Sequence, residues 1–319
     1  MSILIKGIEK KIEKKLKELN LRPGISPKGF LKIHKTGKHR YFSPCLKKDG
    51  ELIAFYARLH DNLDAKEKFV REINFLKRLR KSDLKIKKIT PQILDYGIEK
   101  DFEWLLREYP KSPTLGYSRN LTQKPFPGMI EKITEAILEI SKISPNNFPG
   151  LKKFNCQNYF GKGVYEDLIK KGLISRETSE KLRRIIKKNF PLLEKENRYF
   201  CHGDMNLGNI LSDKKNIWLI DWELIHLNNF AFDIGYLWTH LGEAKRSLRN
   251  ELINSYIEKL NSQKFLKFEK LLPIVVSYLS LGGIELEKKD EKKEIFQKRR
   301  SFYSNLLKNC LDFQKLIKS

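Results

Sequence analysis

The chain has 319 residues, of which 40% are hydrophobic and 11% aromatic. That length and composition allow one or two units with large cores, which excludes an intrinsically disordered protein. The formal net charge is +25, but lysines supply most of the positive charge and are spread along the whole sequence. Nucleic-acid binders more often gather Arg and Lys on one element among aromatic residues, so net charge alone does not favour that class.

The sequence contains four widely spaced cysteines: Cys45, Cys156, Cys201 and Cys310. None forms a C-x-x-C pair, which argues against a zinc site and a disulfide framework and favours reduced, buried thiols in a cytoplasmic protein. The longest apolar run, Leu271–Ile284, is too short to cross a bilayer and contains Pro273. We therefore expect a core helix there and no membrane span.

The N-terminal sequence predicts an amphipathic helix over residues 3–20. Its apolar residues recur at helical spacing and are separated by lysines: Ile5, Ile8, Ile12, Leu16 and Leu19. This pattern is not that of a secretory signal. Such a helix can bind a membrane surface, but we expect it to pack on the domain that follows.

Residues 30–109 predict a small antiparallel sheet with one main helix. Alternating apolar segments at 30–35, 39–46, 51–59, 89–100 and 101–109 read as strands. Between the third and fourth, residues 64–80 place apolar side chains on one face of a helix, with Asp64 as a candidate N-cap. Pro110, Pro113 and Gly116 then indicate a linker.

Beyond this linker the pattern becomes helical. Periodic apolar residues predict helices at 129–143, 163–172, 177–189, 231–242, 246–260, 264–282 and 290–317. Only residues 208–221 break the series, as a tight hairpin. The sequence therefore predicts an α+β protein with two units, a sheet-rich one over 1–109 and a larger, mostly helical one over 110–319.

One constellation of polar residues carries the chemistry. The string His202-Gly203-Asp204 is followed by Asn209 after five residues, and Asp221 follows a short apolar run. Asp204 can accept the proton of a substrate hydroxyl and orient it. The Asn209 amide oxygen and the Asp221 carboxylate are hard ligands that suit Mg²⁺. Phosphoryl transfer from ATP needs this set of groups.

At these residues the chain resembles the aminoglycoside phosphotransferase and choline kinase family, the small-molecule branch of the protein-kinase-like fold. The matching segments are His202–Asn209, Ile220–Glu223 and Phe232–Gly235. The resemblance implies a two-lobed fold with a catalytic loop at 201–209 and a metal-binding strand end at 217–223. It also implies that Asp204 is the catalytic base, that Asn209 and Asp221 hold Mg²⁺, that His202 braces the loop, and that Asp233 is structural.

The resemblance further implies a nucleotide-binding N-terminal lobe over 1–109. Arg58 stands where the family carries an ATP-binding lysine; Arg can still contact phosphates, though the two residues are not equivalent. Glu72 matches the ion-pair glutamate of the following helix, and the loop that contains Gly37 would lie over the phosphates. Glu108 and Tyr109 would form the hinge near the adenine.

Three nearby aromatic residues, Trp222, Tyr236 and Trp238, allow two interpretations. They could line a pocket for a cationic substrate through cation–π contacts, or they could pack in the core. We favour core packing.

The sequence thus predicts a cytoplasmic, ATP- and Mg²⁺-dependent kinase that phosphorylates a hydroxyl group of a small molecule. Three alternatives remain. A protein kinase would need an activation segment, and none is recognisable between Asp221 and Asp233. A catalytically weak or inactive kinase-fold binding protein is suggested by Arg58. A basic nucleic-acid-binding protein is suggested only by net charge. The substrate and the oligomeric state stay open.

Overall fold

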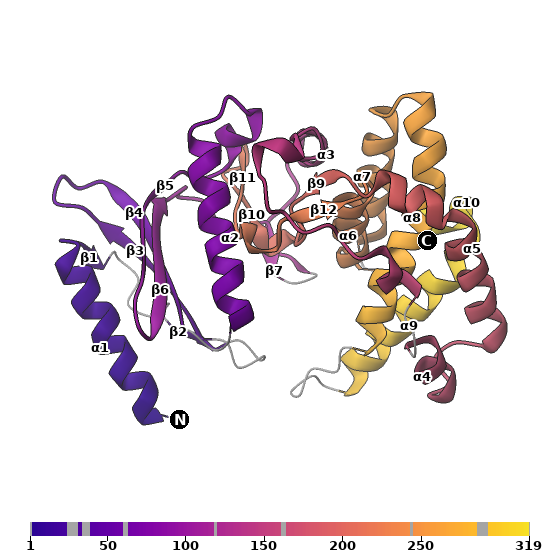
Figure 1. Cartoon of the computed structure of the whole chain (residues 1–319), viewed down its shortest axis with the longest axis horizontal. Coiled ribbons are helices and arrows are strands. Elements are labelled where there is room, and N and C mark those ends of the chain that lie inside the picture. The colour runs from indigo at the N-terminus through magenta and orange to yellow at the C-terminus, as the bar shows by residue number, and fades with distance from the viewer. Residues whose placement is uncertain are drawn as a thin grey trace. The chain divides into compact units, whose positions relative to one another are not determined.

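The computed structural model describes residues 2–23, 31–33, 39–59, 63–117, 120–160, 164–242, 245–285 and 293–318. The chain divides into two compact units, Met1–Lys111 and Ser112–Ser319 (Figure 1). We call them the first and the second unit. The first is an antiparallel sheet with helices, and the second is mostly helical. The α+β fold class predicted from the sequence is therefore confirmed.

The sheet of the first unit is built around one long hairpin. Its described strands are β1 (Arg22–Pro23), β2 (Leu31–Ile33), β3 (His39–Leu46), β4 (Leu52–Leu59), β5 (Ile93–Ile98) and β6 (Phe102–Glu108). They run antiparallel in the order β1-β3-β4-β6-β5, with β2 also paired to β3. The strands predicted from alternating apolar residues are therefore confirmed within the described residues.

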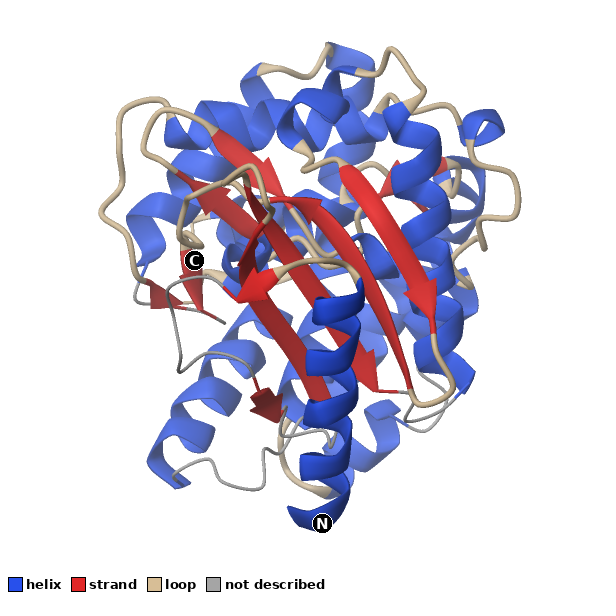
Figure 2. Cartoon of the chain, turned by 90° about the vertical axis from the view of Figure 1, so that its left-hand side faces the viewer, coloured by secondary structure: helices blue, strands red, loops and turns tan. Residues whose placement is uncertain are grey.

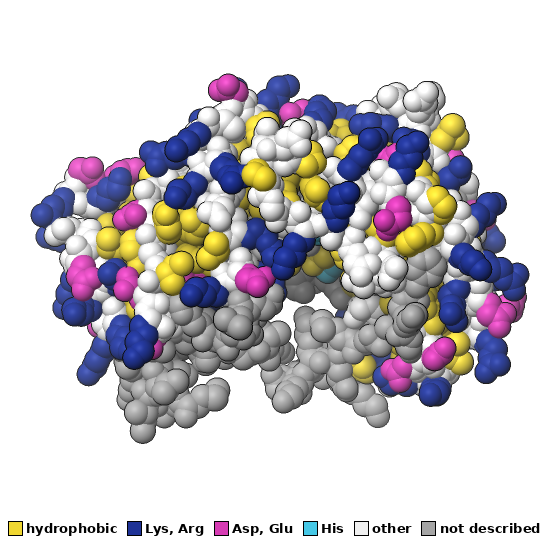
Figure 3. Space-filling view, viewed as in Figure 1, with side chains coloured by type: hydrophobic (Ala, Val, Ile, Leu, Met, Phe, Trp, Pro, Cys, Tyr) yellow, Lys and Arg dark blue, Asp and Glu magenta, His cyan; other side chains and the backbone are white. Residues whose placement is uncertain are grey.

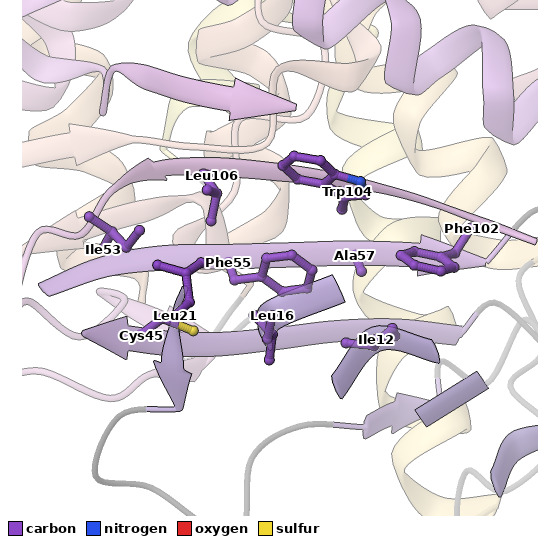
Figure 4. Close-up of a cluster of buried hydrophobic side chains, with 10 residues drawn as sticks. All are labelled: Ile12, Leu16, Leu21, Cys45, Ile53, Phe55, Ala57, Phe102, Trp104 and Leu106. Carbon is purple, nitrogen blue, oxygen red and sulfur yellow. The ribbon is translucent and has the colours of Figure 1, made fainter. Parts of the chain in front are cut away.

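Helix α1 (Ser2–Glu18) packs on one face of this sheet (Figures 1 and 2). Ile12 and Leu16 lie in a buried cluster with sheet residues such as Phe55 and Trp104 (Figure 4). The cluster also contains Leu21, Cys45, Ile53, Ala57, Phe102 and Leu106. The expectation that the N-terminal helix packs on its own domain is confirmed for the described side chains, which begin at Lys10.

Helix α2 (Leu63–Arg80) lies on the opposite face of the sheet (Figure 1). Its predicted apolar face is buried, at Phe69, Ile73, Leu76 and Leu79. The side chain of Asp64, the candidate N-cap, lies outside the described residues. Because side chains alternate across a strand, even-numbered β4 residues such as Arg58 face α2, and odd-numbered ones such as Phe55 face α1.

The second unit contains the described helices α3 (Met129–Ser141), α4 (Val164–Lys170), α5 (Arg176–Glu196), α6 (Phe232–His240), α7 (Arg246–Glu258), α8 (Ser262–Glu285), α9 (Lys293–Asn309) and α10 (Phe313–Ile317). The predicted hairpin is present as β10 (Ile210–Ser212) and β11 (Ile217–Leu219). Two further antiparallel pairs occur, β9 (Tyr199–Cys201) with β12 (His226–Asn228) and β7 (Gly116–Tyr117) with β8 (Asn120–Leu121).

Several sequence-based boundaries in this unit were wrong. The two additional strand pairs are only two or three residues long, too short for alternation to reveal. Helix α5 does not end near 189 but continues through Pro191 to Glu196. Proline in a helix interior costs about 3 kcal/mol, and the burial of the apolar Leu193 side chain beyond it acts against that cost.

The helix predicted over 290–317 is two helices in the described part. A break occurs after Asn309, because the Asp312 side chain accepts the backbone N–H groups of Gln314 and Lys315 and starts α10. Among the described residues, no helix combines the length and the apolar character needed to cross a membrane. The four cysteines are all buried and free.

The packing of α1 can be tested by truncating one side chain. Leu16→Ala should lower the free energy of unfolding by about 2–5 kcal/mol, because Leu16 is buried in the α1–sheet cluster. Lys17→Ala, at the next and exposed position, should change it by less than about 0.5 kcal/mol. Urea unfolding followed by circular dichroism measures both. Equal effects would contradict the packing of α1 on the sheet.

Candidate active site

The loop that carries His202 and Asp204 is anchored to α6 through its backbone. Asp233, in the first turn of α6, accepts the His202 N–H at 2.7 Å and the Gly203 N–H at 3.0 Å. Asp233 is buried. Burial raises the pKa of its carboxyl above the usual range, while the bonds from the loop N–H groups act in the opposite direction. The resemblance implies a structural role for Asp233, and holding the backbone of this loop is a role of that kind.

Gly203 takes a backbone conformation that other residues avoid, with φ of +85°. A Cβ at this position would lie 2.2 Å from the Leu224 carbonyl oxygen. Both the left-handed backbone and the close approach therefore require glycine. The glycine of the His-Gly-Asp string is thus explained by geometry.

His202 connects the loop to the end of β11. Its ring is fully buried and packs against Trp222, with ring centroids 4.4 Å apart. Nδ1 accepts the Asp204 N–H at 3.3 Å, so the ring proton lies on Nε2, which donates to the Ile220 carbonyl oxygen at 3.1 Å. The Ile220 N–H donates to the Asn209 carbonyl oxygen at 3.0 Å. The backbone before Asp221 is therefore fixed to both ends of the loop.

The Asp204 carboxylate is half-buried and held by three side chains. Oδ1 accepts from Asn206 Nδ2 at 2.8 Å and from the Tyr236 hydroxyl at 2.7 Å. Oδ2 accepts from Asn209 Nδ2 at 2.9 Å, and the same nitrogen donates to the Asp204 carbonyl oxygen at 2.9 Å. Two of the sequence-predicted residues, Asp204 and Asn209, are thus in direct contact.

Asp221 stands at the end of β11 with φ of 68° and ψ of 61°. This left-handed conformation costs a non-glycine residue about 1–2 kcal/mol. Strained residues of this kind are concentrated at functional sites, where the surrounding structure holds them in place. The bonds of Ile220 to the loop provide such a hold.

The donor atoms of Asn209 and Asp221 fit a divalent cation. The Asn209 amide nitrogen is used by Asp204, so its amide oxygen is the atom suited to a metal. Within the described part of the chain, no three His, Cys, Asp or Glu side chains gather into a metal cage. One carboxylate and one amide oxygen match Mg²⁺, which takes few protein ligands and completes its shell with phosphate oxygens and water.

The candidate nucleotide residues lie in the first unit. Arg58 is buried, and its Nε donates to Glu103 Oε1 at 2.5 Å across the β4–β6 pair. The Arg58 guanidinium also lies 5.8 Å from the Phe69 ring of α2, and Glu72 of that helix is buried.

Glu108 ends β6 and accepts the Gln92 N–H at 3.0 Å. The Tyr109 ring lies 6.0 Å from that of Phe42. Gly37 lies outside the described residues. The nucleotide roles of these residues stay predictions.

Sequence reasoning missed two partners of the predicted residues. Glu103 is a charged residue between apolar residues of its strand, and that position was the signal that it would face a charged partner such as Arg58. Tyr236 was expected in the core, yet its hydroxyl bonds Asp204. Trp222 and Trp238 are buried as expected, and Trp238 packs under the Arg249 guanidinium at 3.8 Å.

The sequence matches the model of the phosphotransferase enzyme family over residues 45–265, more than half of the chain. The chain therefore belongs to this family of phosphotransferase enzymes. The matched residues include the whole His202–Asp233 site. No curated protein matches the sequence.

Solved structures share the fold at low sequence identity. Amicoumacin kinase hAmiN, in complex with AMP-PNP, Ca²⁺ and Ami, is 10% identical with a TM-score of 0.56, over 95% of this chain and 96% of that chain. The GDP and kanamycin complex of APH(2″)-IIia is 12% identical with a TM-score of 0.54, over 91% and 92%. Choline kinase LicA from Streptococcus pneumoniae is 15% identical with a TM-score of 0.54, over 94% and 99%. These matches confirm the predicted kinase-like fold.

The requirement for glycine at 203 can be tested against a matched position. Gly50 has φ of +84°, almost that of Gly203, but a Cβ there would meet nothing within 4 Å. Gly50→Ala should therefore cost about 1–2 kcal/mol of stability from backbone strain. Gly203→Ala should cost about 1–3 kcal/mol more from overlap with the Leu224 carbonyl. Equal losses in chemical denaturation would contradict the close approach.

Proposed function

We propose that the protein transfers the γ-phosphate of ATP to a hydroxyl group of a small molecule. The observation that carries this proposal is the Asp204 carboxylate, held in a loop whose other end, Asn209, is bonded to the strand end that presents Asp221. A proton acceptor and two metal-binding groups are thereby joined in one rigid segment. In-line phosphoryl transfer depends on positioning of this kind.

Each residue has a distinct task in the proposed reaction. Asp204 orients the acceptor hydroxyl and takes its proton as the oxygen attacks the γ-phosphorus. Asn209 and Asp221 would hold Mg²⁺, which when bound neutralises charge on the phosphate oxygens. His202 keeps the loop and β11 together and does not itself touch the reacting atoms. In the first unit, Arg58 and Glu72 are the proposed phosphate-side residues, with Glu108 and Tyr109 toward the adenine.

The structural neighbours support nucleotide and divalent cation use. One was solved with GDP and kanamycin, and another with AMP-PNP and Ca²⁺. Their small-molecule ligands differ from one another, so they do not identify the acceptor of this chain. We propose a small hydroxyl compound as the acceptor class and ATP with Mg²⁺ as the donor.

The alternative of a weakly active or inactive kinase-fold protein rests on Arg58. The buried ion pair with Glu103 gives Arg58 a structural task in addition to any contact with phosphate. The complete set of Asp204, Asn209 and Asp221 favours the enzyme. Nucleic-acid binding is not favoured, because lysines and arginines are dispersed among acidic side chains on the face in view (Figure 3).

Mg·ATP binding separates these functions. Millimolar Mg·ATP should raise the melting temperature of the wild type by several degrees, because a ligand that binds only the folded state stabilises it. Asp221→Ala should abolish the shift through loss of the metal ligand. Asp204→Asn serves as the matched control: it should keep the shift and lose most of its turnover, with a small residual rate, measured as ADP release over a panel of hydroxyl metabolites. The absence of any shift in the wild type would contradict the proposal.

A further inference from the structure

The Tyr236 hydroxyl donates to Oδ1 of Asp204 at 2.7 Å. We propose that Tyr236 is a positioning residue, which fixes the Asp204 carboxylate so that Oδ2 is the oxygen that receives the proton of the acceptor hydroxyl. This role rests on the proposed phosphotransferase function.

The hydrogen bonds to Asp204 determine which oxygen can act. A carboxylate oxygen has two lone pairs, so the group accepts about four hydrogen bonds in all. On Oδ1 both positions are filled, by Asn206 Nδ2 at 2.8 Å and by the Tyr236 hydroxyl. Oδ2 accepts from Asn209 Nδ2 at 2.9 Å. Among the hydrogen bonds of the described residues, this leaves one acceptor position for the substrate hydroxyl, and it is on Oδ2.

Tyr236 is itself held firmly on α6. Its ring stacks on that of His240, with centroids 4.1 Å apart and an interplanar angle of 14°. The His240 ring also forms a hydrogen bond from Nδ1 to the Tyr236 carbonyl oxygen at 2.8 Å. Burial raises the pKa of the Tyr236 hydroxyl, and the nearby Asp204 carboxylate raises it further. The hydroxyl therefore remains protonated, as a donor must be.

The same face of α6 holds both the backbone and the side chain of the loop. Asp233 and Tyr236 are three residues apart, a spacing that places side chains on one face of a helix. Asp233 binds the His202 and Gly203 N–H groups, and Tyr236 binds the Asp204 carboxylate. A single rigid element thus sets both where the loop lies and how its carboxylate is turned.

The test compares two tyrosine-to-phenylalanine variants. Tyr236→Phe removes the donor to Asp204. Tyr256→Phe removes a fully buried hydroxyl that donates to the Phe230 carbonyl oxygen at 2.8 Å, away from Asp204. We expect Tyr236→Phe to lower kcat about 10-fold, equal to about 1.4 kcal/mol of activation free energy, with KM for ATP unchanged. Tyr256→Phe should leave kcat near the wild-type value.

A double-mutant cycle with Asp204→Asn shows whether the two residues act together. In the Asp204→Asn background, Tyr236→Phe should cause little further loss of kcat, because residues that act as one unit are not additive. An active wild type whose kcat is unchanged in Tyr236→Phe would overturn the role of Tyr236. So would a tenfold loss that persists in full in the Asp204→Asn background.

Unfolding free energies of the same four proteins separate this role from the proposed function. The wild type could transfer no phosphate to any acceptor while the unfolding free energies of Tyr236→Phe and Asp204→Asn are still non-additive. That result would overturn the phosphotransferase proposal, and with it the role of Tyr236 in catalysis, but would confirm the contact between the two side chains. Activity in the wild type, with a loss of kcat in Tyr236→Phe that Tyr256→Phe does not share, supports both.

Discussion

The Asp233 carboxylate and the two N–H groups that it accepts, from His202 and Gly203, form the contact on which the site depends. A buried carboxylate is costly unless its charge is met by hydrogen bonds, and here the loop backbone supplies them. The loop N–H groups, in turn, have no helix or sheet partners. The carboxylate supplies the acceptors that the N–H groups need, and the N–H groups supply the donors that the carboxylate needs. The loop is therefore held in one conformation at the N-terminus of α6.

From that fixed path the other features follow. Gly203 must turn with positive φ to pass the Leu224 carbonyl, and the turn brings the His202 ring to the Ile220 carbonyl oxygen. Ile220, bonded also to Asn209, holds Asp221 in a left-handed conformation. The residues of the proposed reaction therefore lie on a short segment held together by hydrogen bonds, and α6 sets its orientation.

The sequence predicted that these residues lie together, and their roles in the reaction stay predictions. Asp204, Asn209 and Asp221 are close in sequence, and the hairpin between the last two brings them together. The sheet and most helices followed from periodicity. Contacts between residues far apart in sequence were harder to predict. Glu103 contacts Arg58 because the register of β4 and β6 places them opposite each other, and Tyr236 contacts Asp204 because of the face of α6 on which it lies. Helix ends failed where packing outweighed a local signal, as at Pro191, or where a cap interrupted a periodic pattern, as at Asp312.

Amide hydrogen exchange over Tyr199–Asn209 tests most directly whether Asp233 holds the His202–Asn209 loop. In Asp233→Ala, the amides of His202 and Gly203 should exchange at least about tenfold faster than in the wild type, since each loses a buried hydrogen bond. Asp213→Ala is the matched control, because Asp213 also accepts two backbone N–H groups, from Lys215 and Asn216, but in the exposed hairpin turn. It should leave the loop unchanged. Wild-type protection of His202 and Gly203 in Asp233→Ala would contradict the account.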